Sequence, residues 1–261
     1  METLSVERAS GEAEASPDPS WSGLYRAGGV SAVLFVVLTI VSIVLAFITP
    51  QPQSAGGSLM LPGGVATLQY IASNRSVFIL DQILFVGPVV FTIVVFLALY
   101  VALKHLNPGK SYAAIGAVVG IVGVVLSLVP LSLVGGLVYL SDQYVAATTV
   151  AQRAVFTTAA DSLIAQNNIV SSGGILFAVG VLIISLAMLQ GVFHKGIAYL
   201  GIATGVVGII CEALRPILGP AYSVYLILLI WLIAVGWKLY QLGSSSSTSR
   251  VAKQLEAGTA S

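Results

Sequence analysis

Six long apolar runs alternate with polar segments along the chain, and they set its fold class. Each run has about 20 residues or more, the length that an α-helix needs to cross the hydrocarbon core of a bilayer. Inside that core the backbone has no water to bind, so each segment must satisfy its own N–H and C=O groups as a helix. The sequence therefore predicts an all-α protein, a polytopic membrane bundle with six transmembrane helices at residues 28–48, 78–103, 113–140, 169–190, 196–218 and 223–242.

The third run is the longest and contains residues that weaken a helix. Pro130 has no backbone N–H to donate, and Gly135 and Gly136 follow it closely. We expect this span to kink or to tilt.

The segments outside the runs are of two kinds. Residues 1–23 and 243–261 are polar and are predicted to be disordered tails around a membrane domain at 24–242. Residues 65–74 and 143–166 lack Gly and Pro and mix apolar with polar side chains, which predicts short helices at the outer membrane interface. An ordinary solvated loop is the alternative for both of these segments.

Lysine and arginine gather on one side of the six predicted spans. Eight of the 11 lie in or beside the two tails and in the connectors after the second and fourth spans, and three lie on the other side. Positively charged flanks stay in the cytoplasm. We therefore expect a protein of the cell membrane with cytoplasmic N- and C-termini and with residues 49–77 and 141–168 outside.

The composition indicates that the protein is surrounded mainly by lipid, and it limits the kinds of site that the chain can form. Hydrophobic residues make up 57% of the chain and charged residues only 8%, against about 25% charged in soluble domains, so the lipid bilayer is the main partner. The net charge of +1 gives no basic surface for nucleic acid. A single cysteine, Cys211, and two histidines, His105 and His194, offer no metal-binding spacing. We expect no metal site and no cofactor.

Glycines recur at helical spacing in two of the runs. Such rows let helix backbones approach closely inside a membrane. Packing within one bundle is the main hypothesis, and a homo-oligomer formed through one row is the alternative. The rows are Gly116, Gly120 and Gly123 in the third run and Gly201, Gly205 and Gly208 in the fifth.

Three ionisable residues lie inside the runs and form a candidate polar cluster. Asp81 lies near the outer end of the second run, and Glu212 and Arg215 share one face near the outer end of the fifth. Charges inside a membrane usually face the protein interior and pair. The cluster predicts either a Glu–Arg pair that pins helices, with Asp81 capping its helix, or a substrate or ion site. Arg215 extending to the interface is a third possibility.

One stretch of the second run has a recognisable pattern. A segment rich in Ala and Asn leads to Arg75, Asp81 follows six residues later, and the run ends in ALYVALK at residues 98–104. Residues 71–109 thereby resemble the bacterial six-span family DUF4386, although His105 stands where that family often has Pro. The resemblance extends over residues 24–242. It implies a six-helix membrane fold and implies no activity.

The residues do not point to an enzyme. The sequence has no phosphate-binding glycine loop and no Ser/His/Asp set within the predicted bundle. We expect a non-catalytic membrane module of unassigned molecular function. A small secondary transporter or solute-binding membrane protein that uses the Asp81, Glu212 and Arg215 cluster is the alternative, and any small-molecule ligand stays unidentified.

Overall fold

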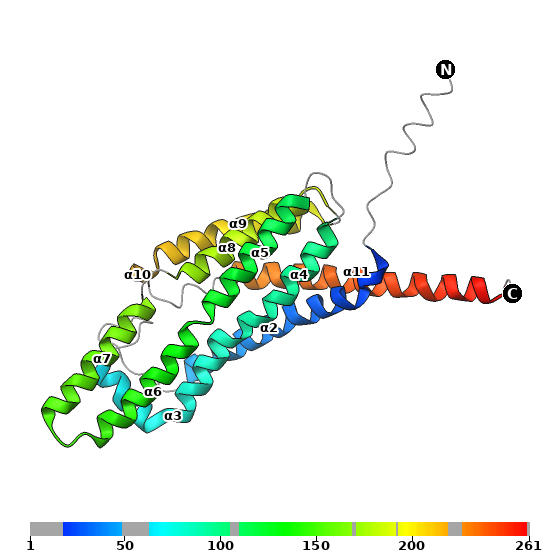
Figure 1. Cartoon of the computed structure of the whole chain (residues 1–261). Helices are drawn as coiled ribbons and strands as arrows, with labels where there is room; N and C mark the ends of the chain where they lie inside the picture. The colour runs from blue at the N-terminus through cyan, green and yellow to red at the C-terminus, as the bar shows by residue number, and fades with distance from the viewer. Residues whose placement is uncertain are drawn as a thin grey trace.

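The computed structural model describes residues 18–48, 63–104, 110–168, 171–191, 193–218 and 226–259, and every regular element in these ranges is a helix (Figure 1). Six helical stretches are long and apolar enough to cross a membrane, which confirms the predicted fold class. The short 3₁₀ helices are η1 (Pro19–Trp21) and η2 (Gly87–Val90). The α-helices are α2 (Ser22–Ile48), α3 (Gly64–Val86), α4 (Phe91–Leu103), α5 (Lys110–Ser127), α6 (Pro130–Ala146), α7 (Val150–Asn168), α8 (Ser172–Met188), α9 (Lys195–Ala213), α10 (Arg215–Leu218) and α11 (Leu226–Thr259).

The helices form two groups along one elongated molecule (Figure 1). The main bundle contains α2, α4, α5, α8, α9 and α11, and its core includes Phe96 and Trp231. The second group, called the cap here, contains α3, α6 and α7 around a smaller core that includes Leu68, Leu137 and Ala160. The start of α2, the end of α4, the start of α9 and the C-terminal part of α11 lie at the opposite end, called here the termini end.

Glycines bring α5 and α8 into backbone contact. A Cβ built on Gly123 would overlap the backbone of Phe177, and one on Gly116 would fall 2.6 Å from a backbone nitrogen of α8. From the other side, a Cβ on Gly180 would overlap Gly120. Lipid tails are as apolar as these helices, so the hydrophobic effect does not drive the helices together. Close van der Waals contact of this kind drives their association instead.

Two glycines of the second predicted row pack against a different face of α8. A Cβ on Gly205 would lie 2.7 Å from the Cβ of Leu182, and one on Gly201 would overlap the side chain of Ser185. Gly208 is buried in the same helix. Because Gly201 and Gly205 face helices of their own chain, a homo-oligomer would have to use other surfaces.

A third glycine seam joins α2 to α11 and was not expected from the sequence. A Cβ on Gly29 would lie 2.8 Å from the carbonyl oxygen of Gly236, and one on Gly236 would lie 2.7 Å from the Cβ of Ala32. Nearer the termini end, Arg26 Nε donates to the carbonyl oxygen of Gly243 over 3.2 Å. These glycines lie on two different runs, so spacing within one run could not reveal them.

The predicted third span bends at the expected place. α5 ends at Ser127 and α6 begins at Pro130, so residues 113–140 form two helices. The N–H groups of Leu128 and Val129 bond to carbonyls three residues back, at 3.2 Å each, which tightens the helix before the proline. The second span, residues 78–103, is likewise divided among the end of α3, η2 with its Pro88, and α4.

Both segments predicted as short outer helices are helical, with different boundaries. The segment 65–74 is the first part of α3, which continues to Val86 after a kink at Asn74 (φ −135°, ψ 37°). The segment 143–166 contains the end of α6, a break at 147–149, and α7. Thr149 Oγ1 accepts from Gln152 N at 3.2 Å, and Gln152 Oε1 accepts from the N–H groups of Thr148 and Thr149. This reciprocal capping box starts α7, and its Thr-x-x-Gln pattern is visible in the sequence.

The predicted tails are shorter than expected where the structure describes them. α2 begins at Ser22, before the predicted start at residue 28, and residues 1–17 lie outside the described part. α11 continues to Thr259, beyond residue 243, where the polar tail was predicted to begin. Hydropathy locates the membrane boundary but not the helix end. Residues 250–257, rich in Ala, Leu, Lys, Gln and Glu, continue a helix that is already formed.

We predict opposite effects of the same small substitution at two glycines. Gly123→Ala should destabilise the protein by about 1–3 kcal/mol, because its methyl group would collide with the α8 backbone. Gly135→Ala should leave stability unchanged or raise it by about 1 kcal/mol, since Ala is the better helix former and nothing lies within 4 Å of the added Cβ. Thermal unfolding in detergent measures both. Equal behaviour of the two variants would show that the α5–α8 seam is not close-packed.

Candidate functional site

Glu212 and Arg215 form a buried ion pair where α9 meets α10. Arg215 Nη1 lies 3.3 Å from Glu212 Oε2, and the side chains of Arg215 and Glu212 are 11% and 5% exposed. Leu214 forms the turn between the two helices. The structure thus brings together two of the three residues of the predicted polar cluster.

The Glu212 carboxylate also rests on the first turn of α8. A Cβ on Gly174 would overlap this carboxylate, so only glycine leaves room for it. Ser171 caps the helix, its Oγ accepting from Gly174 N at 3.1 Å. An anion is favoured at this end of a helix, where unpaired N–H groups carry a partial positive charge. The negative charge of Glu212 is therefore stabilised by both Arg215 and α8.

Arg215 is less completely satisfied than its partner. Its Nε is buried and has no hydrogen-bond partner in the described part of the chain. A buried pair with an unsatisfied donor contributes little net stability, although loss of one member leaves the other charge buried alone. The geometry is that of a structural link between α8, α9 and α10.

Asp81 lies elsewhere. Among the described residues, no ion pair or hydrogen bond joins it to Glu212 or Arg215. It is partly buried beside the Gln82 side chain, in the interior of α3. The prediction that Asp81 caps a helix start is wrong, because α3 begins at Gly64, well before the apolar run.

An aspartate from α7 caps α3 instead. Asp161 Oδ1 accepts a hydrogen bond of 2.6 Å from Gly64 N, at the positive end of α3. Deeper in the cap, Ser141 Oγ donates to the carbonyl oxygen of Leu68 over 2.8 Å. These bonds tie the first part of α3 to α6 and α7. Hydropathy gave no signal for them, since both partners lie outside the apolar runs.

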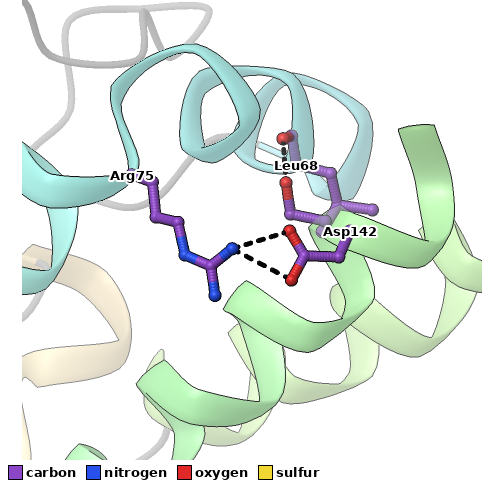
Figure 2. Close-up of polar contacts among 4 residues, drawn as sticks. Leu68, Arg75 and Asp142 are labelled. Atoms are coloured by element: carbon purple, nitrogen blue, oxygen red, sulfur yellow. Dashed lines mark hydrogen bonds and ion pairs between the residues drawn. The ribbon is translucent and has the colours of Figure 1, made fainter. Parts of the chain in front are cut away.

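A second ion pair joins α3 to α6 at the surface of the cap. Arg75 Nη1 lies 3.0 Å from Asp142 Oδ1 and 3.1 Å from Oδ2 (Figure 2). The side chains are 55% and 53% exposed. From the sequence alone, Arg75 was used only in the count of positive charges on each side of the membrane and as part of the DUF4386-like pattern. Its partner was missed because the two residues are 67 positions apart.

The ion pair stands at one end of a groove between α3 and α6. The groove has a volume of about 540 Å³ and is open to the surface. Apart from the ion pair its walls are apolar or aromatic, and its remaining lining residues are Ile79, Ile83, Leu131, Val134, Gly135, Val138 and Tyr139. Charge at one end and apolar walls along the rest give the groove an amphipathic character.

The comparison with protein families decides what the chain is related to. The model of DUF4386, a domain of unknown function, matches residues 30–240. The chain belongs to the DUF4386 family. The DUF4386 match runs from α2 into α11, so it includes both ion pairs and the groove. Searches of curated proteins and of solved structures each gave no match.

The described part of this DUF4386 chain holds no group of three or more His, Cys, Asp or Glu side chains placed to bind a metal ion. The arrangement offers two kinds of chemistry. The Glu212–Arg215 pair is enclosed and can hold helices together. The Arg75–Asp142 pair is accessible and can meet a ligand.

We predict that the two members of the enclosed pair depend on each other. Glu212→Gln alone and Arg215→Met alone should each destabilise the protein by about 3–5 kcal/mol, because each leaves a buried charge unpaired. The double variant should recover much of that loss. Unfolding in detergent gives the coupling free energy, and simply additive single effects would show that the pair is not coupled.

Proposed function

We propose that the protein is a non-catalytic membrane module that binds an amphipathic ligand in the groove between α3 and α6. The observation that carries this proposal is the pairing of apolar groove walls with an accessible ion pair at one end. An amphipathic molecule has the same division into an apolar part and a charged part. The main bundle, closed by glycine contacts around α8, supports the role of a rigid base.

Counting residues along the helices supports a position for the apolar end of the groove at one edge of the hydrocarbon core. At the termini end, Lys104 Nζ lies 4.7 Å from the ring centroid of Trp21, a combination typical of a membrane interface. From this level, α4, η2 and the last turn of α3 rise about 30 Å to Ile83, and α5 with the start of α6 rises about the same distance to Leu131. The hydrocarbon core is itself about 30 Å thick.

The charged end of the groove then falls at the outer boundary of the headgroup layer, which extends about 5–8 Å beyond the hydrocarbon core on each side. Arg75 is eight residues beyond Ile83 on α3, which adds about 12 Å, and Asp142 on α6 lies at a comparable height. Two separate helical paths support this position. A ligand in the groove would have its apolar part beside the acyl chains and its charged part among the headgroups.

For orientation, we propose that the cap faces outward from the cell membrane and that both termini are cytoplasmic. The excess of Lys and Arg near the termini end supports this orientation. The transporter alternative has less support, because Asp81 makes no contact with Glu212 or Arg215 among the interactions of the described residues.

We predict that filling the groove releases a bound amphiphile. Gly135 lies in the groove wall, and a Cβ added to it would have nothing within 4 Å, so Gly135→Phe should fold and occupy the ligand volume. Gly23→Phe is the matched control, since Gly23 also has open space but lies at the start of α2. Native mass spectrometry after mild detergent extraction should show retained phospholipid on the wild type and on Gly23→Phe only. Equal retention on Gly135→Phe would refute the groove as the binding site.

We predict the orientation from labelling of single cysteines in a Cys211→Ser background. Val150 is 86% exposed in the cap, and Lys195 is exposed at the start of α9. A membrane-impermeant maleimide added to intact cells should label Val150→Cys and should label Lys195→Cys only after the cells are opened. The reverse pattern would invert the proposed orientation.

A further inference from the structure

We infer that the charged end of the groove selects phospholipids whose headgroup carries both a phosphate and a primary ammonium, as in phosphatidylethanolamine. This inference rests on the proposed function and names the class of ligand. It is carried by the geometry of Arg75 and Asp142, by the apolar walls beside them, and by the height of the pair relative to the hydrocarbon core.

Arg75 keeps donors available for a phosphate. Both contacts to Asp142 come from Nη1, and Figure 2 shows the other terminal nitrogen directed away from the carboxylate. A guanidinium has five N–H donors, so Nη2 and Nε still offer three. With half of its side chain exposed, Arg75 can bind a phosphate oxygen while it keeps its contact with Asp142.

Asp142 supplies the complementary charge. Each of its carboxylate oxygens accepts one hydrogen bond from Arg75 and has a further lone pair. A primary ammonium has three N–H donors for these positions, whereas the quaternary ammonium of a choline headgroup has none. An anionic headgroup without an ammonium gains Arg75 but is repelled by Asp142. A pair of zero net charge therefore favours a zwitterion whose cation can donate hydrogen bonds.

The rest of the groove suits the acyl region of the same molecule. Ile83 and Leu131 line the end that lies level with the hydrocarbon edge. Tyr139, 62% exposed on α6, lines the groove between the apolar and charged ends, and aromatic side chains with a polar tip commonly occupy this depth. A soluble zwitterion would leave these apolar walls uncovered. The apolar walls together with the ion pair therefore favour a lipid as the ligand of the groove.

The test compares three lipids with identical acyl chains on the delipidated full-length protein. Phosphatidylethanolamine, phosphatidylcholine and phosphatidylglycerol are titrated separately, and bound lipid is measured by native mass spectrometry. The wild type should bind phosphatidylethanolamine about tenfold more tightly than the other two, the change expected from one charge-assisted hydrogen bond. Similar affinities for all three lipids would overturn the inference, and this comparison needs no variant.

Two variants of the exposed pair then test the contribution of each charge to lipid binding separately. Arg75→Gln should weaken the binding of all three lipids, because all three contain the phosphate. Asp142→Asn should remove the preference for phosphatidylethanolamine and strengthen the binding of phosphatidylglycerol, because the carboxylate no longer repels its negative charge. Lys195→Gln, which removes a charge at the termini end, should change none of the affinities. An unchanged order of affinities in Asp142→Asn would overturn the inference.

The groove-filling variant distinguishes failure of this inference from failure of the proposed function. If Gly135→Phe abolishes binding while the wild type binds the three lipids equally, the groove binds lipid and the headgroup selection is wrong. If Gly135→Phe binds phosphatidylethanolamine as the wild type does, the groove itself is wrong. A dimer that is independent of lipid and dissociates in Gly135→Phe would assign the groove to a second copy and overturn both.

Discussion

Backbone contact along both faces of α8 is the constraint on which the rest of this structure depends. Lipid tails are as apolar as the helices, so the helices must associate through shape. α5 approaches one face through Gly123, and α9 approaches another through Gly205. At the first turn of α8, Gly173 accommodates Ser127 of α5 and Gly174 accommodates the Glu212 carboxylate. The space left by glycines that lack a side chain thus determines where the buried Glu212 carboxylate can lie.

The two ion pairs show how depth changes what a pair of charges can do. Glu212 and Arg215 are almost fully enclosed, so each fixes the other and both link α8, α9 and α10. Arg75 and Asp142 are half exposed, so their mutual attraction is screened by solvent and contributes little to stability. The weaker pair is the one that stays available to a ligand.

Local sequence features predicted the local parts of this structure. Hydropathy located the six spans, Pro130 located the break between α5 and α6, and glycine spacing located the seams on α8. Contacts between distant segments were beyond such reasoning. The position of Asp81 depended on where α3 begins, and Gly64 at that start is capped by Asp161, which lies 97 residues further along the chain. The groove was invisible for the same reason, since its two walls come from different spans.

The tie between Asp161 and Gly64 has a consequence for biosynthesis. A chain is made from its N-terminus, and contacts between distant residues must wait for the later partner. The first part of α3 leaves the ribosome long before α7, with no carboxylate yet present for its leading N–H group. Arg75 likewise cannot form its ion pair until Asp142, 67 residues later in the chain, has been synthesised. The cap is therefore completed only after the third long apolar stretch, α5 with α6, has been made, whereas the contact between α2 and α4 can form much earlier. A ribosome that stalled between α6 and α7 would leave a nascent chain with three of its long apolar stretches made and an unfinished cap.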